Sequence, residues 1–328
     1  MARKIILDVD TGSDDAVALM TAILSPDIEL VAACSVAGNN PIDATTENTL
    51  RVVEAMRADV PVYRGAPAPL LKKLVPNRLT PTPRSRVVVA EGEKVVKMHD
   101  EYLSLPEAAA KAQDMPAAMF YVDYLRNTPE PITLVLVGPL TNLAIALLMD
   151  PTIVSNIEEL VIMGGGYKVT NASSSAEFNV FFDPEAALWV LRCGAKITWV
   201  PLDATHNAYL TLDDCTAFRA LGTVAGDFAA DLIAQRIFVH TYLQPLSVPD
   251  AAAVHDALAV CYLIDPNVLR DVRHVHMDIG LGDYGDGQTI IDPRFHPEER
   301  NCWFAFDGDP ARFSEVLQGI FKLGPKSS

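Results

Sequence analysis

Four aspartates crowd the start of the chain, in the stretch KIILDVDTGSDDAV; they are Asp8, Asp10, Asp14 and Asp15. The apolar residues before them predict a buried strand, and the apolar run at 16–24 predicts a helix. Four like charges so close together repel one another unless a cation or a set of hydrogen-bond donors neutralises them. The stretch therefore indicates a charged site at the junction of a strand and a helix.

Simpler explanations of the same aspartates have to be weighed. Carboxylates stabilise the first turn of a helix, so Asp14 or Asp15 can be a cap and Asp8 a surface residue. Capping needs one carboxylate, however, and leaves Asp10 unexplained. An EF-hand loop does not fit, because Gly12 occupies its fifth place and its twelfth is not Glu. An aspartate-dependent phosphohydrolase stays a distant alternative, since that pattern expects Thr or Val where Gly12 stands.

The composition limits the class of protein. With 328 residues, 50% apolar and 21% charged, the chain is long enough for a substantial globular core. The net charge of −16 argues against nucleic acid or an anionic membrane as a partner and leaves small neutral or cationic ligands and metal ions. Five scattered cysteines predict neither a disulfide framework nor a zinc site. With no signal-like segment and no long apolar run, we expect a cytoplasmic protein.

Strand and helix patterns alternate along the chain. Strands are predicted at 29–36, 60–63, 132–137, 160–163 and 196–202, and helices at 43–56, 107–126, 143–149, 213–243, 257–263 and 310–323. This order predicts an α/β fold, namely one open, mostly parallel, Rossmann-like sheet flanked by helices, with a small antiparallel addition near 285–292. We expect a single domain over residues 1–328. Ligands bind beyond the carboxyl ends of such strands, so Asp10 and Asn39 should face one crevice.

Two segments interrupt this alternation. Residues 64–106 are rich in proline and basic side chains, which predicts an irregular excursion that is either a lid over the crevice or a solvated surface loop. Three glycines, Gly164 to Gly166, follow a predicted strand. They lack the spacing of phosphate-binding and dinucleotide-binding loops, so we expect them to allow close approach of the backbone to a ligand.

Further polar side chains follow other predicted strands. They are Asn171, Glu177, Asn179, His255 and Asp256. Oxygen ligands without sulfur indicate a hard cation such as calcium or magnesium. A histidine before an aspartate is often a capping or core pair, but beside an acidic cluster catalysis is the better account. The ordinary pKa of histidine suits His255 to proton donation near neutral pH.

Taken together, these residues resemble the inosine-uridine preferring nucleoside hydrolases. The segments that carry the resemblance occur in the family's order: LDVDTGSDDAVAL, AGNN, VGPLTNLA, VIMGGGY, NASSSAEFNVFFDPEAA and VHDALAV. The resemblance implies hydrolysis of ribonucleosides to ribose and free base, with bound Ca²⁺, in a homodimer or homotetramer. A catalytically silent nucleoside-binding or ribose-binding protein on the same fold remains the alternative. Neither the preferred base nor a role in salvage or in catabolism follows from the sequence.

The resemblance also implies roles for individual residues. The calcium ligands would be Asp10, Asp15, Asp256 and the backbone carbonyl of Val137. Asp10 would be the general base that activates a water molecule, and His255 the acid that protonates the departing base. The substrate-binding residues would be Asp14, Asn39, Met163, Asn171, Glu177, Asn179, Asp256 and His99. His99 lies in MHDEYLSLPE, where the family usually has His-Gly-Glu, and the lack of a tryptophan beside Asp256 favours the broad or pyrimidine-tolerant subgroup.

Overall fold

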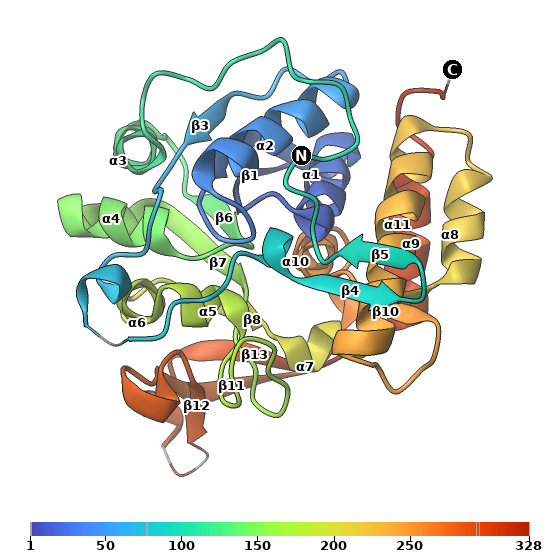
Figure 1. The fold of residues 1–328 in the computed structure, drawn as a ribbon. Helices are drawn as coiled ribbons and strands as arrows, with labels where there is room; N and C mark the ends of the chain where they lie inside the picture. Colours follow the sequence, from blue (N-terminus) through green and yellow to red (C-terminus); the bar gives the residue numbers. More distant parts are fainter. Residues whose placement is uncertain (1, 77, 293, 295, 328) are drawn as a thin grey trace.

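A single large sheet organises the chain (Figure 1). The computed structural model describes residues 2–76, 78–292, 294 and 296–327, and nine strands of these residues form the sheet. From edge to edge they are β12 (Thr289–Asp292), β11 (Leu269–Ile279), β13 (Cys302–Gly308), β8 (Ile197–Val200), β7 (Ile157–Met163), β6 (Ile132–Leu136), β1 (Arg3–Val9), β2 (Ile28–Ser35) and β3 (Val62–Arg64). Pairing is parallel from β13 to β3, and antiparallel between β13 and β11 and between β11 and β12. The predicted α/β architecture with a small antiparallel addition is confirmed.

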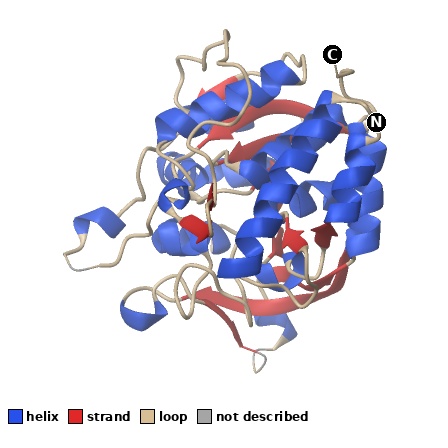
Figure 2. Cartoon of the chain, turned by 45° about the vertical axis from the view of Figure 1, so that its right-hand side comes forward, coloured by secondary structure: helices blue, strands red, loops and turns tan. Residues whose placement is uncertain are grey.

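Helices cover both faces of the sheet because successive strand residues point to opposite sides (Figure 2). In β1, Ile5 and Leu7 belong to one apolar core and Ile6 to the other. The first core is formed with α1 (Ser13–Leu24), α2 (Ile42–Ala55), α8 (Leu212–Arg219), α9 (Val224–Leu243), α10 (His255–Ile264) and α11 (Pro310–Phe321). The second is formed with α3 (Ala117–Asn127), α4 (Thr141–Met149) and α6 (Pro184–Leu191).

The order of the strands places a crevice at one edge. The chain runs outward from β1 through β2 to β3 and then returns to β6 on the other side of β1. Strand order reverses at this point, where parallel α/β sheets form ligand crevices. Asp10 follows β1, Asn39 follows β2, and Val137 follows β6. The carboxyl ends of adjacent strands thus bring together residues that are far apart in sequence.

Several short elements complete the surroundings of this crevice. They are α5 (Phe178–Phe182) and α7 (Leu202–Thr205), the antiparallel pair β9 (Tyr209–Thr211) and β10 (Ala251–Ala253), and the hairpin β4 (Val88–Glu91) and β5 (Lys94–Lys97). The hairpin belongs to the excursion predicted at 64–106, which we call the strap; its residue Asn77 lies outside the described residues.

A buried ionic network fastens the strap to the far end of the molecule. The Lys72 side chain is fully buried, with Nζ 3.1 Å from an oxygen of Asp286 and 3.2 Å from the centre of the Phe181 ring. Arg78 binds the same Asp286 through Nε at 2.9 Å and also pairs with Glu185. Two cations therefore share Asp286, and the strap is anchored at Lys72 and Arg78 although the residues at 73–76 are exposed.

One predicted helix starts later in the structure, and the region predicted to be filled by helices at 213–243 contains two. The helix expected at 107–126 begins only at Ala117, because the backbone N–H of Gln113 extends the sheet edge by donating to the carbonyl of Val62 at 2.8 Å. The region 213–243 is two helices, since Gly222 adopts a φ of +62° and Thr223 caps α9. The start of the first helix is therefore corrected, whereas the region 213–243 is helical as predicted.

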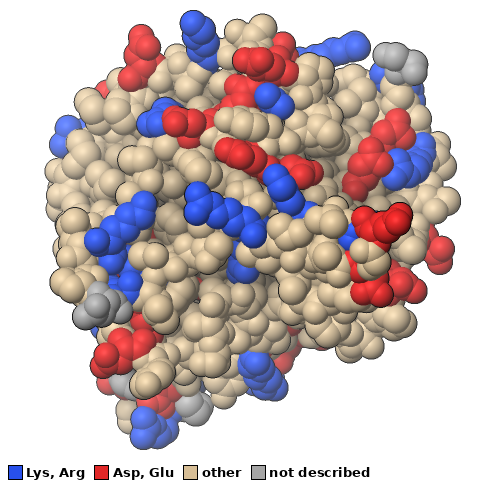
Figure 3. All heavy atoms as spheres, viewed as in Figure 1, with Lys and Arg blue, Asp and Glu red and all other residues tan. Residues whose placement is uncertain are grey.

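The surface of the face shown in Figure 1 is mixed in charge. Figure 3 shows acidic and basic side chains interspersed over it, so this face does not form one acidic field. Within the described residues, no helix is both long enough and apolar enough to cross a membrane.

The ionic network leads to a stability prediction. Asp286→Ala leaves Lys72 and Arg78 buried without their shared carboxylate, and breaking a buried ion pair costs about 3–5 kcal/mol. We expect faster proteolysis within the strap and a lower midpoint in urea unfolding. The matched control is Asp231→Ala, which removes a pair with Arg219 whose side chains are 62% and 46% exposed and which should cost less than about 1 kcal/mol. Equal protease resistance in the two variants would contradict the anchoring role.

Candidate active site

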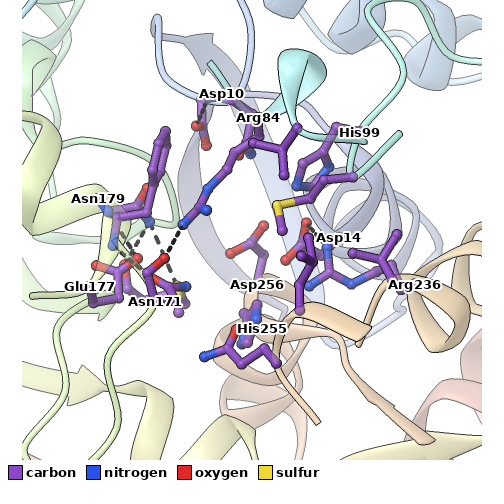
Figure 4. Close-up of a pocket in the computed structure, with 18 of the residues that line it drawn as sticks. Asp10, Asp14, Arg84, His99, Asn171, Glu177, Asn179, Arg236, His255 and Asp256 are labelled. Atoms are coloured by element: carbon purple, nitrogen blue, oxygen red, sulfur yellow. Dashed lines mark hydrogen bonds and ion pairs between the residues drawn. The ribbon is translucent and has the colours of Figure 1, made fainter. Parts of the chain in front are cut away.

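A cavity of about 300 Å³ opens at the carboxyl ends of the central strands (Figure 4). Its walls come from the β1–α1 junction, the strap, the loop between β7 and α5, the end of α9, and the start of α10. The sequence-predicted residues that line it are Asp10, Asp14, Asn39, His99, Val137, Met163, Asn171, Glu177, Asn179, His255 and Asp256. The folded chain therefore brings the predicted site residues together, and Asp15 lies directly behind them in the buried first turn of α1.

Three buried carboxylates form the acidic centre of the site. Asp14, Asp15 and Asp256 each offer an oxygen, and these atoms lie within 4.8 Å of one another. Asp14 and Asp15 start α1 and Asp256 starts α10, two helices that pack together. Both helix N-termini favour negative charge there, because their free N–H groups carry partial positive charge. Asp14, which the sequence placed among the substrate-binding residues, thus also belongs to the group that could hold a cation.

Asp15 caps its helix and belongs to the acidic centre at the same time. Its Oδ1 accepts from the backbone N–H of Asp10 at 3.0 Å, and its Oδ2 accepts from Gly12 N–H at 2.9 Å and from Asn39 Nδ2 at 3.2 Å. Burial, followed by repulsion from Asp14, raises the pKa of Asp15 to about 6. Capping and cation binding were separate interpretations of the sequence, but a side chain that caps the helix also lies in the acidic cluster, so the two do not exclude each other.

Asp10 has one oxygen bound and one without a partner. Its Oδ2 accepts from the backbone N–H of Asn39 at 2.6 Å, whereas its buried Oδ1 meets no hydrogen-bond donor among the described residues. A Cβ on Gly38 would come within 2.1 Å of Oδ2, so the carboxylate is packed directly against that backbone. Burial, with further repulsion from Asp15, raises the pKa of Asp10 well above its ordinary value. A buried acceptor without a donor fits a neighbouring cation.

The opposite wall holds amide and carboxylate side chains in fixed positions. Asn179 Nδ2 donates to the carbonyl of Val137 at 2.7 Å and to that of Met163 at 3.3 Å. Glu177 caps α5, accepting from Asn179 N–H at 2.9 Å and from Gly165 N–H at 2.8 Å. The glycine-rich turn therefore serves this wall by presenting a backbone donor to Glu177, and Val137 lines the same cavity.

The two predicted histidines lie in the site in different environments. His255 is buried, and its Nδ1 lies 2.7 Å from Oγ1 of Thr205. Burial, and next the charge of Arg236, lowers the pKa of His255 well below 6.5, so the ordinary pKa expected from the sequence is wrong. His99 Nδ1 accepts from Ser13 N–H at 3.0 Å, and burial lowers its pKa to about 3. Both rings are neutral near pH 7.

Sequence reasoning missed one buried cation that organises the acidic centre. Arg236 Nη1 donates to Asp14 Oδ1 at 3.0 Å and to Ser13 Oγ at 3.1 Å, and its Nε donates to the carbonyl of Ala253 at 2.9 Å. It therefore neutralises part of the cluster and fixes the orientation of Asp14. Its signal was a lone arginine in the apolar helix α9, but the residue lies more than 200 positions from Asp14.

A second missed cation comes from the strap. Arg84 extends across the cavity, where Nη2 donates to the carbonyl of Asn171 at 3.1 Å and the guanidinium lies 4.4 Å from the centre of the Phe178 ring (Figure 4). Val87, Met98 and His99 follow it along the cavity wall. This part of the strap thus lies against the crevice, in agreement with the predicted lid and not with a solvated surface loop.

Asp8 differs from Asp10 and Asp14 because it does not line the cavity, and from Asp15 because it is not part of the acidic centre. It is buried beneath the site, where Oδ2 accepts from Tyr121 Oη at 2.9 Å and from Asn142 Nδ2 at 3.0 Å. The interpretation of Asp8 as a surface residue is wrong. Burial raises its pKa to about 7, although the two donors act in the opposite direction.

Known proteins resemble this chain over nearly its whole length. The family model described as inosine-uridine preferring nucleoside hydrolase matches residues 5–315. The chain is 37% identical over 305 residues to the inosine-uridine preferring nucleoside hydrolase of Leishmania major, covering 92% of this chain and 91% of that one. It is 36% identical over 298 residues to the pyrimidine-specific ribonucleoside hydrolase RihA of Enterobacter sp. (strain 638), covering 89% and 88%.

A solved structure shows the same fold. The purine-preferring ribonucleoside hydrolase from Gardnerella vaginalis superposes with a TM-score of 0.84 at 28% identity, covering 98% of this chain and 100% of that one. The names of these relatives differ in the base that they prefer.

The burial of Asp8 predicts a pH dependence of stability. Because its pKa is about 7 in the folded protein and near 3.8 in the unfolded chain, the folded state binds more protons between these values. In metal-free buffer, stability should therefore fall from pH 4 to pH 7, with up to about 4 kcal/mol from Asp8 alone.

Urea unfolding at pH 5 and pH 8 with a chelator measures this decrease. Asp8→Asn should flatten it, because a neutral amide does not titrate but can still accept through its oxygen. A variant as pH-dependent as the parent protein would exclude Asp8 as a source of the decrease.

Proposed function

The chain belongs to the family of inosine-uridine preferring nucleoside hydrolases, and on this basis we propose that it cleaves the N-glycosidic bond of ribonucleosides to give ribose and free base. In this reaction the bond from the anomeric carbon to the base breaks, and a bond to a water oxygen forms. The observation that carries the proposal is the unpartnered buried oxygen of Asp10 beside the carboxylates of Asp14, Asp15 and Asp256.

The donors in this centre support a calcium site. All of them are oxygens, which suits a hard divalent cation. Asp10, Asp15, Asp256 and the carbonyl of Val137 are the proposed ligands, with Asp14 close enough to the centre to contribute. When bound, such a cation lowers the pKa of a coordinated water and holds vicinal hydroxyl groups. Burial, and next the repulsion from neighbouring aspartates, raises the pKa values of Asp10, Asp15 and Asp256, and a bound cation would oppose both effects.

Asp10 is the proposed general base. Asp10 lines the cavity, and its buried Oδ1 meets no donor among the described residues, so this oxygen is the proposed acceptor for the proton of the attacking water. Asn39 holds the other oxygen of Asp10 at 2.6 Å and fixes the carboxylate in place. A pKa raised by burial makes the group a stronger base than an exposed aspartate.

The remaining polar residues are proposed to hold the ribose. Asp14, Asn171, Glu177 and Asn179 offer side-chain oxygens and amides around one cavity, which suits the hydroxyl groups of a sugar. Breaking the bond leaves positive charge on the sugar ring in an oxocarbenium-like transition state. The surrounding carboxylates stabilise that charge more than they stabilise the neutral substrate, which is the condition for faster reaction.

His255 is the proposed partner of the departing base. It lies next to Asp256 at the start of α10 and lines the cavity. As the glycosidic bond breaks, negative charge collects on the base, and an N–H group of His255 can donate a hydrogen bond to it. Its lowered pKa favours this role for the neutral ring over that of a cationic acid.

We further propose broad base acceptance that includes pyrimidines. The described lining residues include Phe178, His240 and Gln244 but no tryptophan. Relatives named as inosine-uridine preferring and as pyrimidine-specific, at 37% and 36% identity, support the same choice.

Removal of calcium and substitution of Asp10, the proposed general base, provide the first test of the function. The parent protein should release ribose from inosine, adenosine, uridine or cytidine, and a chelator should abolish the release until calcium is restored. Asp10→Ala should lower kcat by about 100-fold to 10,000-fold, the usual contribution of a general base. Asp231→Ala serves as the surface control. A parent protein that binds nucleosides but releases no ribose would be the silent binding protein instead.

The leaving-group role of His255 can be tested with two substrates. His255→Ala should slow uridine and inosine by about 100-fold, whereas nitrophenyl riboside, whose leaving group needs no assistance, should change little. His296→Ala, at an exposed position, is the control. Equal losses on natural and activated substrates would remove His255 from this role.

A further inference from the structure

Thr205 is a buried hydroxyl that the proposed mechanism does not yet use. It is the last residue of the short helix α7, which follows β8, and its side chain is 1% exposed. It lies 50 positions from His255 in sequence, yet its Oγ1 is 2.7 Å from His255 Nδ1. The inference below rests on the proposed function, because it concerns how His255 meets the departing base.

The length of this contact indicates which atom donates. Hydroxyl donors most often lie about 2.7–2.8 Å from an oxygen acceptor, whereas N–H donors most often lie about 2.9–3.0 Å from one, within a range of about 2.7–3.2 Å. At 2.7 Å, the Thr205 hydroxyl fits the donor role. The other acceptor within reach, the carbonyl of Leu202, is 3.4 Å away and competes poorly for the single hydroxyl hydrogen. The short contact and the distant carbonyl together favour His255 Nδ1 as the acceptor.

An acceptor at Nδ1 decides where the neutral ring carries its hydrogen. A neutral imidazole has one N–H and one lone pair, so the lone pair on Nδ1 places the hydrogen on Nε2. Among the described residues nothing hydrogen-bonds Nε2, while His255 lines the cavity. The N–H group thus remains available for a ligand.

The other groups around His255 do not provide an alternative partner. The ring of His206 stacks on it at 5.8 Å, and the ring of His240 lies 6.0 Å away. His240 Nδ1 is 3.0 Å from the carbonyl of Gln244, which can only accept, so that nitrogen is already used as a donor. Arg236, the nearest cation acting on the ring, is held by Asp14 and by the carbonyl of Ala253. These neighbours pack around the ring, and Thr205 sets its hydrogen-bonding state.

We propose that Thr205 is a positioning residue that fixes His255 as the Nε2–H tautomer, so that its N–H points to the departing base. When the bond to the anomeric carbon breaks, its electron pair stays on the base nitrogen, and Nε2–H donates a hydrogen bond to the base. The hydrogen remains on Nε2, and the base takes its final proton from solvent. A neutral imidazole acts as an electrophile in this way in other enzymes.

Two substitutions at one position separate the hydroxyl from its shape. Thr205→Val keeps the branched side chain and removes the donor, whereas Thr205→Ser keeps the donor. For uridine and inosine we expect Thr205→Val to lower kcat by about 10-fold to 100-fold, with KM changed less than about 3-fold. Thr205→Ser should stay within about 3-fold of the parent protein. With nitrophenyl riboside, kcat of both variants should change less than about 3-fold.

A spectroscopic measurement tests the tautomer without activity. Nitrogen-15 NMR of histidine-labelled protein, with the His255 signals assigned by loss in His255→Gln, should show Nε2 protonated in the parent protein and in Thr205→Ser. Thr205→Val should shift the ring towards the other tautomer. Thermal unfolding of each variant checks that it is folded.

Distinct outcomes separate this inference from the proposed function. Protonated Nδ1 in the parent protein would overturn the inference, as would equal losses of kcat on uridine and nitrophenyl riboside in a folded Thr205→Val variant. A parent protein with the expected tautomer but no hydrolysis of any nucleoside would instead refute the proposed function, and the catalytic part of the inference with it.

Discussion

Mutual repulsion among buried carboxylates is the constraint on which the rest of the site depends. Asp10, Asp15 and Asp256 have raised pKa values, and in each case burial is the first cause and a neighbouring aspartate the next. Buried carboxylates that repel one another destabilise a fold, so a cluster of them indicates a functional site. The α1 and α10 N-termini, the Arg236 guanidinium and the Asn39 amide offset part of the repulsion. A divalent cation would neutralise the remaining negative charge.

The sheet makes this arrangement possible because it is rigid and its strands end together. Asp10, Asn39 and Val137 follow three strands that lie side by side, so their positions depend on backbone hydrogen bonds and not on flexible loops. Preorganised groups of this kind need little rearrangement when charge develops on a substrate. The unpartnered oxygen of Asp10 is held as firmly as the bound one, because Asn39 fixes the same carboxylate.

The strap shows how a long segment without much regular structure can still form a cavity wall. Lys72 and Arg78 share Asp286 at the far end of the sheet, while Arg84 reaches the cavity and contacts the loop before α5. The ionic anchor and the cavity wall therefore belong to one segment. The connection between β11 and β12, which carries Asp286, thus helps to hold the cavity wall in place. Because these ion pairs attach the strap to the rest of the protein, the strap needs few apolar contacts to stay in place.

Local patterns in the sequence were enough to predict the alternation of strands and helices, the acidic residues after the first strand and the candidate residues His255 and Asp256. Periodicity and spacing are properties of neighbouring residues, so they can be seen without the fold. They could not reveal Arg84, Arg236 or Thr205, whose partners lie 87, 222 and 50 positions away. Nor could they give the protonation state of His255 or the burial of Asp8, since a pKa depends on every charge and every layer of protein around a group. The identity and order of the candidate site residues follow from the sequence, whereas their charge and orientation arise only when distant segments pack against them.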